Sequence, residues 1–319
     1  MMQPNTPKKL LFEILFTLIF LILVFIVYLL WERTRDPLKA INNIDLNVRK
    51  VSSQTTLDSL IAGKRYYSDI HILSEETDTI KAIISFPPGY SNRRLPVITI
   101  LGGLRIAREN FSFIKNPGQN IIIIYIYPYQ AEQWQRGFIL SEIPKVRSAI
   151  LQTPGQIAEL MHWTQQQEWA DTNKVSLLGY SFGALFTPAV EQVAAQNHIR
   201  TGPLIISYGG ADFDLLLQQN LKVKPKWLRP LIAWFGSTLI YSVDPIHHAP
   251  KMKGNIYLIN GRHDNQIPKD SWQLLHRLAP ATSKIDILDE GHMHPRKPEL
   301  TQKLVDMSRQ WLKKQGILN

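Results

Sequence analysis

The chain has 319 residues, of which 45 % are hydrophobic, and a formal net charge of +10. This length suits one large α/β domain with an appendage, or two small domains. The absence of cysteine excludes disulfides, thiolate metal sites and cysteine nucleophiles. Because the sequence contains neither a zinc-helix spacing nor a nucleic-acid-binding module, we expect no metal, no cofactor and no nucleic acid partner. An anionic membrane surface is the more natural partner for the positive charge.

An apolar run at the N-terminus predicts a membrane anchor. Residues 10–30 carry a single charge, Glu13, and as a helix they would extend about 31 Å, close to the thickness of the hydrocarbon layer. Tyr28 and Trp31 stand where an interfacial aromatic belt would lie. The sequence therefore predicts an N-terminal transmembrane helix within residues 1–35.

A cleaved signal peptide is the main alternative for this segment. Signal peptides have a shorter apolar core and a small-residue cleavage site, and no A-x-A pattern follows this run. A buried core helix is disfavoured because the run is apolar on all faces. Two lysines and the α-amino group precede the run, and three basic residues follow it. We expect a cytoplasmic N-terminus and a domain on the extracytoplasmic side.

Residues 36–65 are polar and mixed, and we interpret them as a stalk. Apolar, β-rich runs follow at 66–74, 79–86, 95–101, 120–126, 175–178, 203–207, 255–259 and 284–288. Helix periodicity marks 153–169, 184–196, 271–278 and 298–314. Strands that alternate with helices and are apolar on both faces predict a mostly parallel sheet covered on both sides. The first two strands should form an antiparallel hairpin at its edge, because no helix separates them.

The most informative motif is Gly179-Tyr180-Ser181-Phe182-Gly183, which lies between the run 175–178 and the helical segment 184–196. A G-x-S-x-G sequence in this context predicts a sharp, strained turn that lifts the serine hydroxyl above the sheet edge. Glycine is needed on both sides because a Cβ there would crowd the neighbouring strand and helix. The alternative is a glycine-bracketed loop with a capping serine.

Three chemically complementary residues follow strands that end at the same rim. Ser181 follows 175–178, Asp264 follows 255–259, and His292 follows 284–288. The carboxyl ends of parallel strands gather into one crevice, so these side chains should meet. A serine hydroxyl needs a base, histidine is suited to that role, and a buried carboxylate fixes the histidine tautomer.

Several neighbouring residues are alternatives or bystanders. Asp264 could cap the backbone of its own turn, and Asp212, after the run 203–207, is the competing acid. His294 is the alternative base or lines the entrance. His263 is expected to point away from the site, and the histidines at 247–248 to be surface or packing residues.

A developing oxyanion requires two backbone N–H donors. Phe182, directly after the serine, is expected to supply one. The second is expected from Gly103 in the loop Gly102-Gly103-Leu104, with Leu104 as the substitute. The alternative is that these glycines form a plain strand-to-helix turn.

Taken together, these motifs resemble the serine hydrolases of the α/β-hydrolase superfamily, of the esterase or lipase type. The matching segments are the elbow at 179–183, the acid loop at 261–268, the histidine loop at 291–293 and the approach Asp244-Pro245. The resemblance covers about residues 66–315. It departs at Leu101-Gly102, where many members have His-Gly, and the HGGG type is absent. This departure leaves the second oxyanion donor open.

The resemblance implies an α/β-hydrolase domain at 66–319, with a roughly eight-stranded sheet and helices on both faces. It also implies hydrolysis of an ester or related acyl substrate through an acyl-enzyme. Acyl transfer and peptidase action would use the same three residues, and a tethered scaffold that binds a partner without turnover is the alternative from another class.

One connection is longer than usual and predicts a small helical cap at about 212–250. Lys222, Lys224, Lys226 and Arg229 are interleaved there with aromatic and aliphatic residues. The pattern suggests a basic, aromatic face that touches the membrane surface or a lipid-like substrate. The alternative is an ordinary helical insertion with solvated lysines.

Overall fold

The computed structural model describes residues 7–46, 50–58, 65–103, 110–128, 142–294 and 296–319. Within these ranges one sheet has the order β1-β2-β3-β5-β4-β6-β7-β8-β9. The first four strands in this order pair antiparallel, and the pairs from β5 to β9 are parallel. The strands are β1 (Lys50–Asp58), β2 (Arg65–Leu73), β3 (Ile80–Phe86), β4 (Leu95–Leu101), β5 (Ile121–Ile126), β6 (Ala170–Tyr180), β7 (Leu204–Ser207), β8 (Ile256–Gly261) and β9 (Lys284–Leu288).

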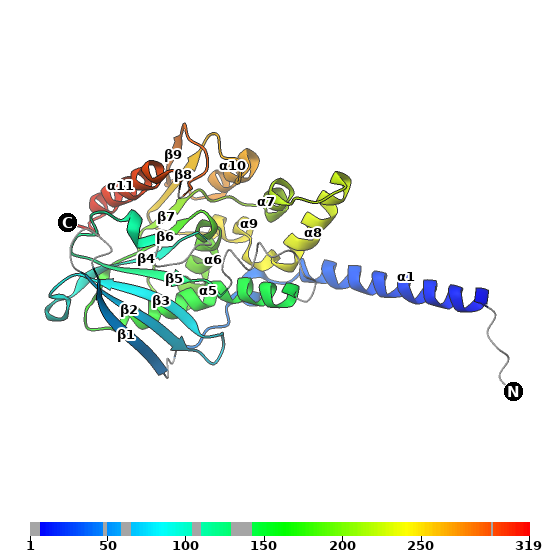
Figure 1. Ribbon diagram of the computed structural model, residues 1–319, viewed down its shortest axis with the longest axis horizontal. Coiled ribbons are helices and arrows are strands. Elements are labelled where there is room, and N and C mark those ends of the chain that lie inside the picture. The colour runs from blue at the N-terminus through cyan, green and yellow to red at the C-terminus, as the bar shows by residue number, and fades with distance from the viewer. Residues whose placement is uncertain (1–6, 47–49, 59–64, 104–109, 129–141, 295) are drawn as a thin grey trace.

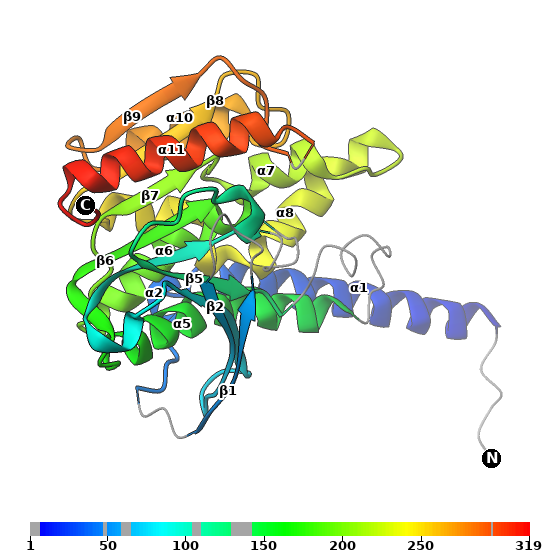
Figure 2. The same ribbon diagram turned by 60° about the vertical axis from the view of Figure 1, so that its left-hand side comes forward.

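Helices cover both faces of this sheet, as Figures 1 and 2 show. The helices are α1 (Pro7–Glu32), α2 (Pro37–Ile41), α5 (Ile143–Gln165), α6 (Phe182–Gln196), α7 (Phe213–Asn220), α8 (Arg229–Leu239), α9 (Pro245–His248), α10 (Lys269–Leu278) and α11 (Pro298–Lys314). The 3-10 turns are η1 (Tyr90–Asn92), η2 (Phe111–Phe113), η4 (Lys226–Leu228), η5 (Tyr241–Val243) and η6 (Ala249–Lys251).

The central strand β5 explains the two-sided covering. Ile121 and Ile123 belong to the core beneath α5 and α6, whereas Ile122 and Ile124 belong to the core beneath α11. Successive side chains of a strand point to opposite faces, so an unbroken isoleucine run needs helices on both. The expected mostly parallel, two-sided α/β sheet is confirmed.

One strand was not predicted from the sequence. The described residues form nine strands where about eight are expected. The extra strand, β1, lies in residues 36–65, which were expected to form a stalk. It pairs antiparallel with β2 from Lys50 opposite Leu73 to Asp58 opposite Arg65. Its sequence, KVSSQTTLD, is mostly polar. An edge strand has only one neighbour and less to bury, so it lacks the apolar run that marks the central strands.

Helix α1 extends away from the domain (Figure 1). Most of its apolar side chains are exposed. Among the described residues, one helix, Lys9–Glu32, is long and apolar enough to cross a membrane. Membrane anchors and signal sequences share this property.

The C-terminal end of α1 contacts the domain directly. Leu29 and Glu32 are buried, and Glu32 accepts a hydrogen bond from Arg147 of α5 at 2.9 Å. Asp36 caps α2 by accepting from the backbone N–H of Leu38 and of Lys39. The end of α1 therefore packs directly against α5.

The segment expected as a cap is helical. It consists of α7, α8 and α9 with short 3-10 turns between them. Both views show that α7 and α8 lie on the side of the domain from which α1 extends (Figures 1 and 2).

Candidate active site

Ser181 occupies a strained turn between β6 and α6. Its backbone has φ 53° and ψ −115°, in a region that side-chain-bearing residues seldom adopt. A Cβ on Gly183 would lie 2.0 Å from the carbonyl oxygen of Leu101, and one on Gly179 would lie 2.1 Å from Thr187 Oγ1. The glycines therefore let strand β4 and helix α6 approach the turn, as the motif predicts.

Replacing Gly183 with alanine should destabilise the protein, because the new methyl group would meet a backbone carbonyl that cannot rotate away. We expect the free energy of unfolding to fall by about 3 kcal/mol or more. Thermal melting of the purified protein measures the change. Gly103→Ala is the matched control, since no described atom lies within 4 Å of its Cβ position. Equal melting temperatures for the two variants would contradict this explanation.

The structure brings the three distant side chains into one hydrogen-bonded chain. Ser181 Oγ lies 2.8 Å from His292 Nε2, and His292 Nδ1 lies 2.8 Å from Asp264 Oδ2. The His292 side chain is 5 % exposed and that of Asp264 is fully buried. A carboxylate facing Nδ1 favours the tautomer with its proton on Nδ1, which leaves Nε2 to accept the serine proton.

Asp264 fills both of the roles considered for it. Its Oδ1 accepts hydrogen bonds from the backbone N–H of Gln266 at 2.8 Å and of Ile267 at 2.9 Å. Its other oxygen, Oδ2, faces His292. The turn thus fixes the orientation of the carboxylate before it meets the imidazole.

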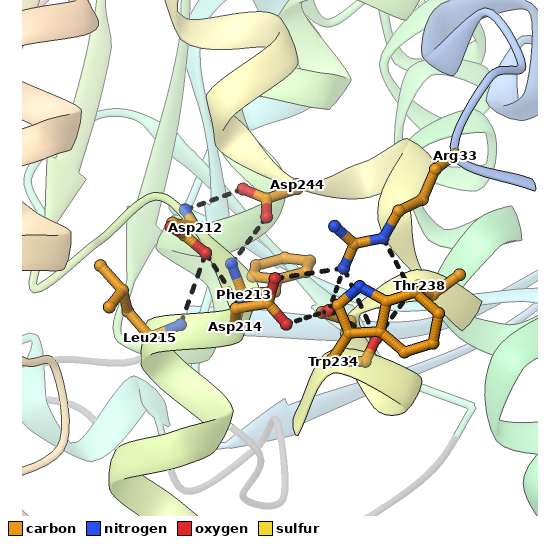
Figure 3. A network of polar contacts seen from close by, with 9 residues as sticks. Arg33, Asp212, Phe213, Asp214, Leu215, Trp234, Thr238 and Asp244 are labelled. Carbon is orange, nitrogen blue, oxygen red and sulfur yellow. Dashed lines mark hydrogen bonds and ion pairs between the residues drawn. The ribbon is translucent and has the colours of Figure 1, made fainter. Parts of the chain in front are cut away.

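Asp212, the alternative candidate for the acid, acts as a helix cap. Asp212 caps α7, and its Oδ1 accepts from the backbone N–H of Asp214 at 3.0 Å and of Leu215 at 3.4 Å. Asp244 holds the same turn by accepting from the backbone N–H of Asp212 and of Phe213 (Figure 3). Burial raises the pKa of Asp244 to about 6.

The other histidines lie apart from the hydrogen-bonded chain. His263 points to Asp289, with its Nε2 2.8 Å from Oδ1, and is exposed. His294 lines the cavity described below. His248 is buried and bonds the carbonyl of Ser242, and burial lowers the pKa of His247 and of His248 to about 4. These two are packing residues.

The two residues expected to supply the oxyanion donors, Phe182 and Gly103, line the same cavity as Ser181. Phe182 is the first residue of α6, and the N-terminal end of a helix favours negative charge. Gly103 follows β4 and lines the same cavity as Ser181 and His292. The substitute donor, Leu104, lies outside the described residues.

A cavity of about 660 Å³ opens at Ser181 and His292. It continues along the sheet face beneath α11, past Ile100 and Ile124, to Ile98 and Ile122, nearer the beginnings of their strands. This volume is typical of small-molecule sites. Most of its lining is apolar, so it suits an apolar group more than a charged one. The described residues contain no cluster of His, Asp and Glu that could hold a metal ion.

Two tyrosines that pack against residues of the site were not predicted from the sequence. The ring of Tyr208 packs edge-on against His292 at 5.3 Å between centroids, from a backbone with φ 59°. The hydroxyl of Tyr127 donates to the carbonyl of Gly102, and its ring packs against Phe182. Tyr208 and Tyr127 each directly follow a strand, β7 and β5, and this position was the available signal.

No family model matches the chain, and no curated protein matches it. Solved structures do. Acetyl xylan esterase 1 from Thermoanaerobacterium sp. JW/SL YS485 aligns with a TM-score of 0.62 at 14 % identity, over 90 % of this chain and 93 % of that one. The acetyl xylan esterase from Paenibacillus sp. R4 gives 0.60 at 13 %, over 85 % and 92 %. The acylaminoacyl peptidase of Pyrococcus horikoshii gives 0.52 at 12 %, over 84 % of this chain and 51 % of the peptidase.

The chain has the α/β-hydrolase fold. In this fold the nucleophile elbow follows a central strand, and the acid and the histidine follow later strands on the same rim. Ser181 follows β6, Asp264 follows β8, and His292 follows β9, so all three residues lie at the carboxyl ends of parallel strands.

Proposed function

We propose that the protein is a membrane-anchored serine hydrolase that cleaves an ester or a related acyl substrate. The observation that carries the proposal is the unbroken path of hydrogen bonds from Asp264 through His292 to Ser181, at the mouth of an apolar cavity. Esterases among the structures of similar fold support the substrate class. The apolar helix α1 supports the anchor. We place the catalytic domain on the extracytoplasmic side because two lysines and the α-amino group precede the apolar run.

In the proposed reaction Ser181 Oγ attacks the acyl carbonyl while His292 Nε2 takes the serine proton. The buried Asp264 carboxylate stabilises the resulting imidazolium. Backbone N–H groups of Phe182 and Gly103 bind the oxyanion, where a single donor is worth about 10²- to 10³-fold in kcat. His292 then protonates the leaving group, and the acyl group remains on Ser181. Water activated by His292 releases the acid and restores the serine.

A fluorophosphonate probe tests the proposal, because it labels only an activated serine. We expect stoichiometric labelling of the detergent-solubilised protein, with the modified peptide mapping to residue 181, and protection by a competing acyl ester. A parallel series of nitrophenyl esters, from acetate to palmitate, measures the preferred chain length. Absence of both labelling and turnover would instead favour a non-catalytic binding scaffold, and labelling at another serine would refute the assignment of the nucleophile.

A further inference from the structure

The cap packs against the apolar helix. The ring of Phe25 in α1 lies 5.7 Å from the ring of Phe235 in α8, measured between centroids. Both residues belong to helices that extend from the same side of the domain (Figures 1 and 2). An aromatic side chain of the cap thus contacts a residue well inside the apolar run 10–30.

Arg33, at the end of α1, fixes this arrangement (Figure 3). Its guanidinium bonds Asp214 of α7 at 3.1 Å and Thr238 of α8 at 2.8 Å. It also stacks over the ring of Trp234, 5.2 Å from the centroid. A planar guanidinium with several donors can hold two helices at once, and these contacts tie α7 and α8 to the end of α1.

The contact between the rings sets the depth of α8. Phe25 precedes Trp31, at the expected interface, by six residues, so it lies about 9 Å further toward the bilayer centre. Phe235 must lie at a similar depth, because its ring touches that of Phe25. A helix held there cannot be surrounded by water while α1 spans the bilayer.

The outer surface of the cap matches this location. Trp227 is 74 % exposed and Leu231 is 60 % exposed, and no other large apolar side chain outside α1 exceeds 46 % among the described residues. Lys222, Lys224 and Lys226, next to them in the chain, are exposed as well. Apolar side chains bordered by lysines are typical of segments that lie in the interface of an anionic bilayer.

The same cap forms a wall of the cavity. Leu216, Leu217 and Asn220 of α7 line the cavity together with Ser181. A Cβ built on Gly236 would lie 3.0 Å from Leu217 Cδ1, so the cavity wall packs directly against α8, next to Phe235. Residues of α7 and α8 therefore connect the apolar helix to the wall of the cavity.

We propose that α7 and α8 form an entrance embedded in the bilayer that α1 spans, through which acyl substrates pass from the lipid to Ser181. Trp227 and Leu231 lie among the acyl chains, and the three lysines contact anionic headgroups. This inference rests on the proposed function, since it needs both the anchor and the hydrolase site. It narrows the substrate to an acyl lipid, or another amphiphile dissolved in the membrane.

The absence of cysteine allows a direct test on the full chain. Single cysteines are introduced as Leu231→Cys, Phe20→Cys and Ile285→Cys, spin-labelled, and reconstituted in vesicles of phosphatidylcholine and phosphatidylglycerol. Collisions of each label with oxygen and with a water-soluble nickel chelate report its depth. Phe20 is the reference within α1, and Ile285, exposed on β9 at the far edge of the sheet, is the matched control in water.

We expect the label at Leu231 to resemble that at Phe20, with an oxygen-to-nickel ratio several times that at Ile285. A label at Leu231 that behaves like Ile285, while Phe20 is embedded, would overturn the entrance and leave the anchor intact. A label at Phe20 that lies in water would show that α1 does not span the bilayer, and this would overturn the proposed entrance as well. These readings do not depend on turnover, so they are separate from any failure of the catalytic assignment.

A second measurement tests entry of the substrate. The double variant Trp227→Gln and Leu231→Gln removes apolar contact with lipid, and neither residue lines the cavity. We expect turnover of a palmitoyl ester dissolved in vesicles to fall about tenfold, while hydrolysis of a soluble acetate ester stays unchanged. Equal turnover of the vesicle-bound ester would contradict the proposal.

Discussion

Alanine at position 181 is expected to lower kcat for ester hydrolysis by about 10⁶. In the proposed mechanism the hydroxyl of Ser181 carries the acyl group, and without it the buried pair of His292 and Asp264 has no hydroxyl to activate. A residual rate of about 10³ above that in water should remain, because backbone donors and cavity contacts still bind the substrate.

Steady-state hydrolysis of nitrophenyl esters, corrected for the spontaneous rate, gives the ratio of kcat values. Ser91→Ala serves as the control, since Ser91 is exposed and its hydroxyl bonds only the neighbouring Asn92 among the described residues. The substitution at position 181 keeps the Cβ and the backbone, so the melting temperature should change little. Turnover within tenfold of the wild type would show that another residue is the nucleophile.

The sequence was sufficient to predict the parts of the site where residues of suitable chemistry follow strands of predictable topology. Each of the three site residues follows an apolar run, and the carboxyl ends of parallel strands share one rim, so their meeting could be predicted. The requirement for glycine at positions 179 and 183 was also predictable, because the turn needs close backbone approach on both sides. In both cases a short sequence pattern predicted close approach between segments that are distant in the sequence.

The contacts of Arg33 show where such prediction ends. In the sequence Arg33 is one of three basic residues after an apolar run, a pattern that indicates only the end of a membrane helix. Its partners Asp214 and Thr238 are 181 and 205 residues away, and no motif links them to it. Strand β1 was missed for a related reason, since pairing at a sheet edge depends on backbone hydrogen bonds and leaves little trace in the side chains.

Asparagine at position 264 is expected to lower kcat/KM by about 10⁴ at neutral pH. The loss follows from the two bonds that Asp264 Oδ1 accepts from the backbone N–H of Gln266 and of Ile267. Only the amide oxygen of asparagine can accept those bonds, so its NH₂ group must face His292 Nδ1. The imidazole would then carry its proton on Nε2 and could no longer accept the proton of Ser181.

Asp212→Asn provides a matched control that also decides between the two acids weighed from the sequence. Asparagine caps a helix as well as aspartate does and tolerates the positive φ of 69° found at this position. Its amide oxygen can accept the bonds now made by the backbone N–H of Asp214 and of Leu215. We therefore expect stability within about 0.5 kcal/mol of the wild type and nearly unchanged turnover.

Both variants can be compared by kcat/KM on one ester and by thermal melting in the same detergent. Each replaces one carboxylate oxygen by an amide nitrogen, so they remove the same charge and differ only in place. The fully buried side chain of Asp264 faces the imidazole, whereas Asp212 faces the first turn of α7. If the loss of turnover appeared in Asp212→Asn and not in Asp264→Asn, the catalytic acid would have to be assigned to Asp212, and the geometry at His292 would need another explanation.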